Sequence, residues 1–279
     1  YGGCTALLPG SKAICSETSD DLFRYSLSNV TNWERLTGHG SPPGPRAFHA
    51  FTALGSDLFL HGGLRESSDT KGLHAAPFDL AEWNSTASSD LYKFSLTTRE
   101  WTIMNDTTGQ VPLALHGHGL AAIKNELFLF GGYQSLSNTT GNVTLSGELL
   151  KLDVAVKKWS QILAADGPSA RAGHGFAAAG LNLFVHGGIV FQNGEYTTVS
   201  DLYQFSTETN LWKQMQPGGQ PPVSRFFHAL GIANEQLFLH GGLSYEVSSG
   251  LTQVDAKLIM YGHSMECFEQ CKPGQYLDV

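Results

Sequence analysis

Histidines recur along this chain in a pattern that could build a metal site. Seven of the 11 histidines fall on two positions of a repeated stretch: His49, His118, His174 and His228 on the first, and His61, His186 and His240 on the second. Imidazole nitrogens bind zinc and copper, so a ring of inward-pointing histidines could hold such an ion. A residue that recurs once per repeat more often serves the repeat itself, through a hydrogen bond between strands, and Phe130 replaces the second histidine in one copy. We therefore expect neither a metal site nor a cofactor.

A constant distance separates these histidines from a pair of glycines. The first histidine of each repeat lies 13 residues before the first glycine, in the pairs His49 and Gly62, His118 and Gly131, His174 and Gly187, and His228 and Gly241. Such constancy indicates one structural unit that is used repeatedly. Two apolar runs around a short polar turn, HAFTAL and DLFLHGG in the first copy, predict a β-hairpin of strands a and b.

A second pair of strands is expected after each double glycine. An acidic residue opens an alternating run, strand c, and a tryptophan follows in strand d; the tryptophans are Trp33, Trp101, Trp159 and Trp212. The N-terminus enters this pattern at the end of a strand b, with YGG at 1–3, and the last copy has strands a, b and c without a tryptophan. The sequence thus predicts about 18 strands.

The double glycine after an apolar strand, the acidic start of the next strand and the tryptophan that follows together resemble kelch repeats. The resemblance covers residues 1–263 and implies an all-β fold, a kelch-type β-propeller of four-stranded antiparallel blades. Six blades are common in that family and five are the alternative; either number needs more strands than this chain supplies. Residues 264–279 resemble the start of an ephrin-receptor-like cysteine-rich repeat, which implies a stalk and leaves open how Cys267 and Cys271 pair.

Stacked blades give structural roles to the repeated residues. Both faces of an inner strand are buried in such a stack, which suits continuous apolar runs such as LFLF. The glycines are expected to adopt positive φ or to admit a neighbouring sheet, and each tryptophan is expected to fill the space between blades. The acidic residues at the start of strand c are expected to pair with arginines; they are Asp21, Asp90, Glu148 and Asp201, and the arginines are Arg46, Arg171 and Arg225, with Leu115 at the arginine position of one copy.

The loops on the two sides of such a blade differ, and this difference predicts where partners bind. The ab and cd turns are short and uniform, whereas the bc loops, on the same side as the da connections, are long and variable; they cover 64–89, 133–146, 189–199 and 243–255. Loops held by a rigid scaffold commonly carry function. Aromatic residues expected to be exposed on the bc/da side, and able to anchor a partner, are Phe78, Trp83, Tyr133, Phe191, Tyr196 and Tyr245. The alternative is that these side chains pack within their own loops.

Cysteines and glycosylation sequons favour an extracellular location. The four cysteines, Cys4, Cys15, Cys267 and Cys271, lie near the chain ends, where disulfides are expected; a bridge from Cys4 to Cys15 is one candidate, and reduced thiols are the alternative. Sequons are more frequent than chance would give, at Asn29, Asn84, Asn105, Asn138 and Asn142. No sequon follows residue 144, so the loops around Phe191, Tyr196 and Tyr245 would stay free of glycans and open to a partner.

Charge, hydropathy and motifs narrow the function classes. A net charge of -8 without a cluster of Lys and Arg argues against binding to nucleic acid or an anionic membrane, and no apolar run reaches the roughly 18 residues of a membrane span. No phosphate-binding loop, G-x-S-x-G or H-E-x-x-H motif occurs. We predict a non-catalytic extracellular or cell-surface module for interaction or assembly, whose partner is a protein, a glycan or a copy of itself. The alternative is a secreted enzyme resembling galactose-oxidase-type copper oxidases, although their cysteine crosslinked to tyrosine has no counterpart within these repeats.

Overall fold

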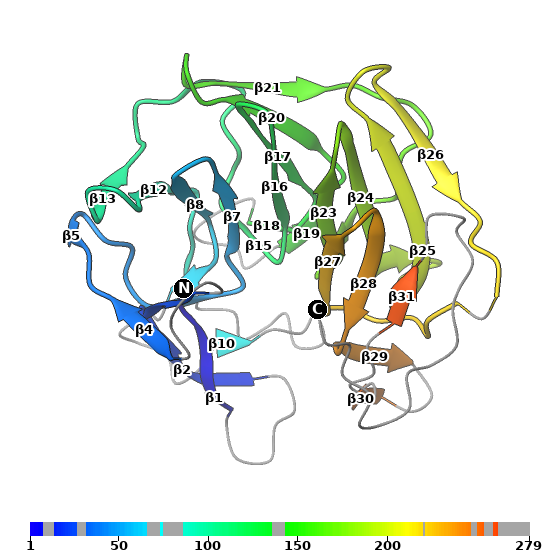
Figure 1. Cartoon of the computed structure of the whole chain (residues 1–279). Coiled ribbons are helices and arrows are strands. Elements are labelled where there is room, and N and C mark those ends of the chain that lie inside the picture. The colour runs from blue at the N-terminus through cyan, green and yellow to red at the C-terminus, as the bar shows by residue number, and fades with distance from the viewer. Residues whose placement is uncertain are drawn as a thin grey trace. The chain divides into compact units, whose positions relative to one another are not determined.

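The chain forms β-strands arranged in small sheets (Figure 1). The computed structural model describes residues 1–7, 14–26, 32–65, 73–74, 86–135, 143–219, 221–246, 250–253 and 259–261. Two compact units divide the chain, Tyr1–Gln161 and Ile162–Val279. In the described part of the chain no helix is long and apolar enough to cross a membrane. The predicted stalk at 264–279 lies outside the described residues.

The predicted ab hairpin is confirmed in four copies. They are β7 (Ala50–Leu54) with β8 (Asp57–His61), β16 (Gly119–Ile123) with β17 (Glu126–Phe130), β23 (Gly175–Ala179) with β24 (Asn182–Gln192), and β27 (Ala229–Ala233) with β28 (Gln236–His240). All four have one register, which places Ala50 opposite His61 and the equivalent residues opposite each other in the other three. Because a one-residue slip would turn every side chain to the wrong face, this shared register fixes which residues meet the neighbouring sheet.

Strands c and d complete the blades. They are β12 (Leu91–Ser95) and β13 (Glu100–Ile103), β20 (Leu149–Asp153) and β21 (Lys158–Ile162), and β25 (Glu195–Ser206) and β26 (Leu211–Met215). The sheets run in the order a, b, c, d, so the four-stranded antiparallel blade is confirmed. At the start of the chain β3 (Leu22–Tyr25) pairs with β4 (Trp33–Leu36) as c and d, and β31 (Ile259–Tyr261) lies beside β28 as the last strand c.

Each bc loop begins as a further small sheet, here called a bc sheet. In three copies a strand of the da connection pairs with the first residues after the double glycine. These sheets are β6 (Arg46–Ala47) with β9 (Leu64–Arg65) and β11 (Thr86–Ala87); β15 (Leu115–His116) with β18 (Tyr133–Ser135) and β19 (Val143–Leu145); and β22 (Arg171–Ala172) with the outer halves of β24 and β25. In the fourth copy β29 (Leu243–Glu246) pairs with β30 (Gly250–Gln253), and Phe226 bridges to Leu243. The bc/da end of each blade is thus anchored in sheet structure.

Besides the strands of the bc sheets, further short strands were not anticipated from the sequence. In the da connections β5 (His39–Gly40) and β14 (Thr108–Gly109) run parallel to strand d of the blade that they enter, with Gly40 opposite Trp101 and Gly109 opposite Trp159. Near the N-terminus β10 (Leu73–His74) joins β1 (Gly3–Leu7) and β2 (Ile14–Ser19) in a separate sheet. Each parallel strand fastens a da connection along the outer edge of its blade.

The two glycines of a pair have different neighbours. Gly62 has φ 69°, and a Cβ added to it would lie 2.5 Å from the Leu115 carbonyl oxygen and 2.7 Å from Cε1 of His118 in the next repeat. A Cβ on Gly63 would instead meet Cβ of His49, in the same repeat, at 2.8 Å. In the second unit Gly187 lies against Arg225 and His228, and Gly188 against Ala172 and His174. The first glycine therefore admits the next repeat, and the second closes its own repeat.

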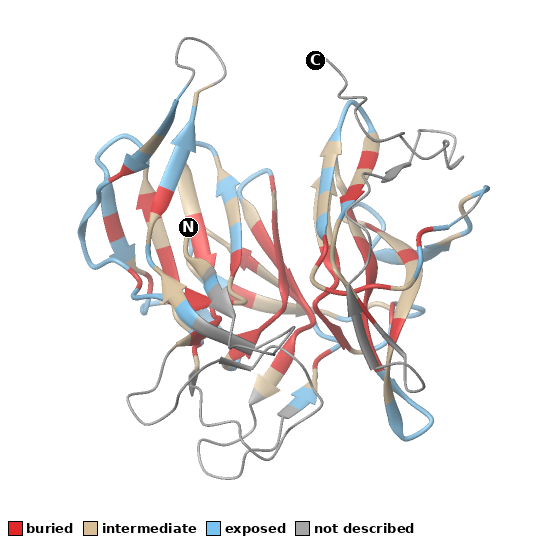
Figure 2. Ribbon diagram, turned by 90° about the horizontal axis from the view of Figure 1, so that it is seen from below, coloured by how far each residue is buried: buried red, intermediate tan, exposed pale blue. Residues whose placement is uncertain are grey.

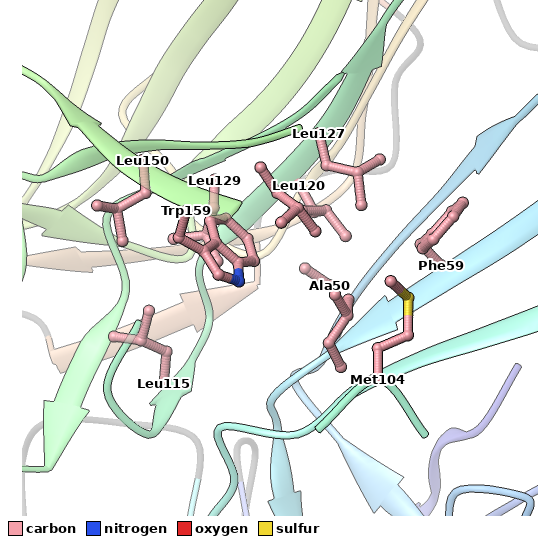
Figure 3. Packing of buried hydrophobic residues seen from close by; sticks show 11 residues of the cluster. Ala50, Phe59, Met104, Leu115, Leu120, Leu127, Leu129, Leu150 and Trp159 are labelled. Atoms are coloured by element: carbon pink, nitrogen blue, oxygen red, sulfur yellow. The ribbon is translucent and has the colours of Figure 1, made fainter. Parts of the chain in front are cut away.

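Apolar side chains of neighbouring blades meet in the core of the first unit. Figure 3 shows Trp159 among Leu120, Leu129 and Leu150, with Ala50 of β7 facing them. In both units strand a of one blade lies beside strand a of the next, β7 with β16 and β23 with β27 (Figure 1). In Figure 2 the buried positions lie along these stacked strands, and the exposed positions lie mainly on outer strands and turns. The buried apolar runs are the feature that the continuous sequence pattern predicted.

The tryptophans do not all share one environment. Trp101 and Trp159 are only 4% and 1% exposed, and Trp212 is partly buried, with Gly38 against Trp101 and Gly167 against Trp212. Trp33 is 70% exposed, so the prediction that it fills the space between blades is wrong. It lies on the outer face of β3–β4 with its ring 5.3 Å from that of Tyr25, and no described segment covers it as Gly38 covers Trp101.

Truncating two of these tryptophans should have very different effects on stability. Trp159→Ala is expected to lower the free energy of unfolding by about 3 to 5 kcal/mol, because it empties a volume enclosed by two blades. Trp33→Ala should change it by about 0.5 kcal/mol or less, since its ring is already in solvent. Urea titration followed by circular dichroism measures both values. Similar losses in the two variants would contradict the burial of Trp159.

Candidate functional site

Four of the seven repeated histidines form two buried pairs between neighbouring repeats. Nδ1 of His61 lies 3.0 Å from Nε2 of His118, and Nδ1 of His186 lies 3.1 Å from Nε2 of His228. All four side chains are at most 7% exposed. One ring must donate and the other accept, so at least the accepting ring in each pair is neutral. The hydrogen bond expected between strands is present, and it joins two blades.

Burial holds these histidines in their neutral form. The pKa of His61 is lowered to about 4 and that of His186 to about 3; desolvation is the largest cause for both, and nearby Arg225 contributes to the shift of His186. Desolvation, followed by His186 and Arg225, lowers the pKa of His228 to about 2. A general base works best with a pKa near 7, so these rings are not tuned for proton transfer. Among the described residues no three His, Cys, Asp or Glu side chains gather closely enough to hold a metal ion.

The repeated arginines bind the backbone of the double glycine. Nη1 donates to the carbonyl oxygen of the first glycine in three copies: Arg46 to Gly62 at 2.9 Å, Arg171 to Gly187 at 2.9 Å and Arg225 to Gly241 at 2.8 Å. In each case Nε also donates to the carbonyl oxygen two residues before the arginine. These bonds connect the da connection to the end of strand b, and therefore support the bc sheet.

Of the predicted pairs between acidic residues and arginines, only one is confirmed. Arg171 makes a bidentate ion pair with Asp201, at 2.6 Å and 3.0 Å. The prediction is wrong for the first two copies, because Asp21 pairs with Arg35 and Asp90 lies 3.4 Å from Arg65. In the copy with Leu115, Glu148 is exposed and its carboxylate accepts a bond of 3.4 Å from Gln161. Strand c opposite Arg225 begins outside the described residues.

An exposed aromatic pair projects from the bc/da end of the second unit. Phe191 and Tyr196 are cross-strand partners near the tip of the β24–β25 hairpin, and their ring centroids are 5.0 Å apart. Phe191 is 57% exposed and Tyr196 is partly exposed. The turn between them, Asn193 and Gly194, has positive φ at both residues, as a type I′ hairpin turn requires. A tight turn, continuous pairing of β24 with β25 from Gly188 to Gln192, and pairing of Ile189 and Val190 with β22 hold the hairpin in one shape.

The other aromatic residues predicted to be exposed are either buried or outside the described part of the chain. Tyr133 is only 1% exposed, so the prediction that it is exposed is wrong. Pairing of β18 with β15 places Tyr133 opposite His116, and their rings stack with centroids 5.0 Å apart. The backbone of Tyr245 belongs to β29, but its side chain, like Phe78 and Trp83, lies outside what the structure describes.

Few of the expected modification sites fall on described residues. Asn105 is exposed in a turn that follows β13, whereas Asn29, Asn84, Asn138 and Asn142 lie outside the described residues. The register places Cys4 opposite Thr18 and Cys15 opposite Leu7, and the side chains of both cysteines are outside the described part. Cys267 and Cys271 are also outside it. The glycans and disulfides therefore remain predictions.

Blades of four antiparallel strands, repeated with one register and stacked with strand a of one beside strand a of the next, are those of a β-propeller. The KLHDC2/KLHL20/DRC7 Kelch-repeats domain matches residues 82–242, more than half of the chain. The chain belongs to this kelch-repeat family.

Kelch-containing relatives match large parts of the chain. Human host cell factor 2 is 32% identical over 151 residues, which cover 52% of this chain and 18% of that protein. Bovine Kelch domain-containing protein 3 is 26% identical over 206 residues, which cover 72% of this chain and 48% of that protein. The chain therefore spans less than half the length of these curated relatives. The structure of YjhT matches with a TM-score of 0.66 and 16% identity, over 90% of this chain and 78% of that one, a likeness of fold alone.

Proposed function

We propose that this chain is a non-catalytic extracellular kelch module that binds a protein partner at the bc/da ends of its blades. The exposed pair of Phe191 and Tyr196 is the observation that carries the proposal. Aromatic side chains that already sit in one conformation lose little entropy on binding and can supply most of the affinity of an interface. Here a rigid hairpin presents them to solvent, where they contribute little to the stability of the core.

The remaining observations support this assignment of roles. Four of the repeated histidines and the three repeated arginines are buried and make contacts between strands, which supports a scaffold role for the residues that first suggested a catalytic or metal site. Membership of the kelch family fits a binding role, since its blades provide a rigid frame for variable loops. A glycan or a second copy of the chain are the competing partners.

The extracellular part of the proposal has its own support. Asn105 is the acceptor of a described sequon, and its exposed position on a turn leaves room for a glycan. The four cysteines at the chain ends and the four further sequons agree with it. Mass spectrometry of the protein from secreting animal cells, before and after enzymatic removal of N-glycans, tests occupancy of Asn105.

Binding should depend on the aromatic pair and not on exposed apolar residues elsewhere. The purified chain is tested against a panel of secreted proteins and receptor ectodomains, a glycan array and itself. For the tightest protein partner, Phe191→Ala combined with Tyr196→Ala should weaken affinity by about tenfold or more. Leu211→Ala, which removes a 62% exposed side chain near the cd turn, should change affinity by about twofold or less.

Two outcomes would each refute a different part of the proposed function. Unchanged affinity in the double variant, with circular dichroism and melting temperature like those of the wild type, would refute the hairpin as the contact. Binding only to glycans, or only to the chain itself, would refute the protein partner.

A further inference from the structure

Two arginines lie opposite each other in the first bc sheet, and only one of them pairs with a described carboxylate. Arg46 on β6 and Arg65 on β9 are direct cross-strand partners, so both side chains point to the same face of the sheet. Like charges in this position repel each other. Arg65 pairs with Asp90, whose Oδ2 lies 3.4 Å from Nη2 of Arg65 and accepts from Ser88 at 2.8 Å and from the Tyr92 hydroxyl at 3.4 Å. This face therefore carries two positive charges against one negative charge.

Arg46 is left without a carboxylate partner. Its side chain is fully buried, Nε and Nη1 bind backbone carbonyl oxygens, and Nη2 has no hydrogen-bond acceptor among the described residues. The guanidinium lies 5.1 Å above the ring of Tyr92, which offsets only part of the charge. A buried donor without an acceptor costs free energy, so an anion that reached Arg46 would stabilise the folded chain.

The second unit shows how the same position is satisfied. Arg171, the equivalent of Arg46, binds both oxygens of Asp201 and also lies over a tyrosine ring, at 5.6 Å from Tyr203. The cross-strand partner of Arg171 is Val190, which corresponds to Arg65 in the first bc sheet. Val199, two residues before Asp201, corresponds to Ser88, two residues before Asp90. Neither of these two positions carries a cation or a hydroxyl that could compete with Arg171 for Asp201. Arg65 and Ser88 are therefore the two residues that differ between these copies and that keep Asp90 from pairing with Arg46.

We propose that Arg65 is a binding site for an acidic side chain of a protein partner. Arg65 is the accessible member of the pair, with 43% of its side chain exposed at the bc/da end of the blade. A carboxylate from the partner replaces Asp90 on Arg65, and Asp90 is then free to pair with Arg46 as Asp201 pairs with Arg171. Two ion pairs replace one, and the buried guanidinium gains its acceptor. This inference rests on the proposed function only in that the ligand is a protein; it does not involve Phe191 or Tyr196.

A capped peptide of alternating glutamate and glycine is the probe, with binding followed by fluorescence anisotropy at low salt. Arg65→Gln should weaken binding by about tenfold, and Arg65→Lys by about threefold because it keeps the charge and loses the planar fork. Arg35→Gln is the matched control, because Arg35 is an exposed arginine already paired with Asp21, and it should change binding by about twofold or less.

The outcomes separate this proposal from its rivals. Equal binding by wild type and Arg65→Gln, with unchanged melting temperatures, would overturn it. Binding of a sulfated oligosaccharide without binding of the peptide would also overturn it, in favour of a glycan. Loss of peptide binding in Arg65→Gln, together with full binding in the Phe191 and Tyr196 double variant, would support the acidic site independently of the hairpin.

Discussion

Gly62→Ala should lower the free energy of unfolding of the first unit by about 3 to 5 kcal/mol. Two costs combine. Gly62 has φ 69°, a conformation that residues with a Cβ adopt at a penalty. The new Cβ would also lie 2.5 Å from the Leu115 carbonyl oxygen and 2.7 Å from His118, so the next repeat must move. That movement would strain the bond of 2.8 Å from Gly63 N–H to the same carbonyl and the contact of His118 with His61.

A second glycine, Gly55, provides the control for the penalty of placing a residue with a Cβ at positive φ. Gly55, in the ab turn of the same unit, has φ 61° and nothing within 4 Å of an added Cβ. Gly55→Ala should therefore cost only the conformational penalty, about 1 to 2 kcal/mol. Urea unfolding monitored by tryptophan fluorescence measures both variants. Equal losses would show that the first glycine of the pair is needed only for its φ, and that close approach of the next repeat is not its role.

Acidification should unfold the chain well above the range in which carboxylates usually titrate. Six histidines have pKa values lowered from 6.5, to about 4 for His49 and His61, about 3 for His116 and His186, about 2 for His228, and well below the ordinary value for His174. Desolvation is the largest cause in each case. An unfolded chain takes up these protons near pH 6.5, whereas the folded chain does so only at much lower pH. Stability is thus fully present above pH 6.5 and falls as the pH drops toward 4.

The expected loss is large because several histidines contribute. His61 alone accounts for about 3 kcal/mol between its unfolded and folded pKa values. The other lowered pKa values act in the same direction, so the loss adds up as the pH falls below 6.5, and unfolding should begin above the pH at which carboxylates titrate. His61→Phe, which copies the phenylalanine at Phe130, should reduce proton uptake on unfolding at pH 5 by about one proton. Stability that stays constant from pH 7 to pH 4.5 would contradict the burial of these rings.

Local sequence patterns were sufficient to predict the blade. The 13-residue interval specifies two strands and a two-residue turn, and the structure contains that hairpin four times with one register. Pairing of Arg171 with Asp201 was also predictable, because the residues around them offer no competing charge. These features depend on neighbours within one repeat, which is the range over which a repeated pattern is informative.

Features that depend on pairing with a strand from another part of the chain, or on a neighbouring segment being absent, could not be predicted from the sequence. Asp90 turns to Arg65 because β9 places that arginine opposite Arg46, and the register of a bc loop leaves no periodic signal. Tyr133 looked exposed because it follows the double glycine, yet pairing with β15 buries it. The parallel strands β5 and β14 have only two residues each, too few for any periodicity to show. The clue that could have revealed Arg65 is the second basic residue in HGGLR, which the other copies lack.

Hydrogen–deuterium exchange on the complex with the tightest protein partner will show whether binding occurs at the bc/da ends of the blades. We expect protection of backbone amides in the outer part of the β24–β25 hairpin, from Gly188 to Val199. Exchange should stay unchanged in the ab turns at 55–56, 124–125, 180–181 and 234–235. Protection confined to those turns, with no change in the hairpin, would contradict binding at the bc/da ends.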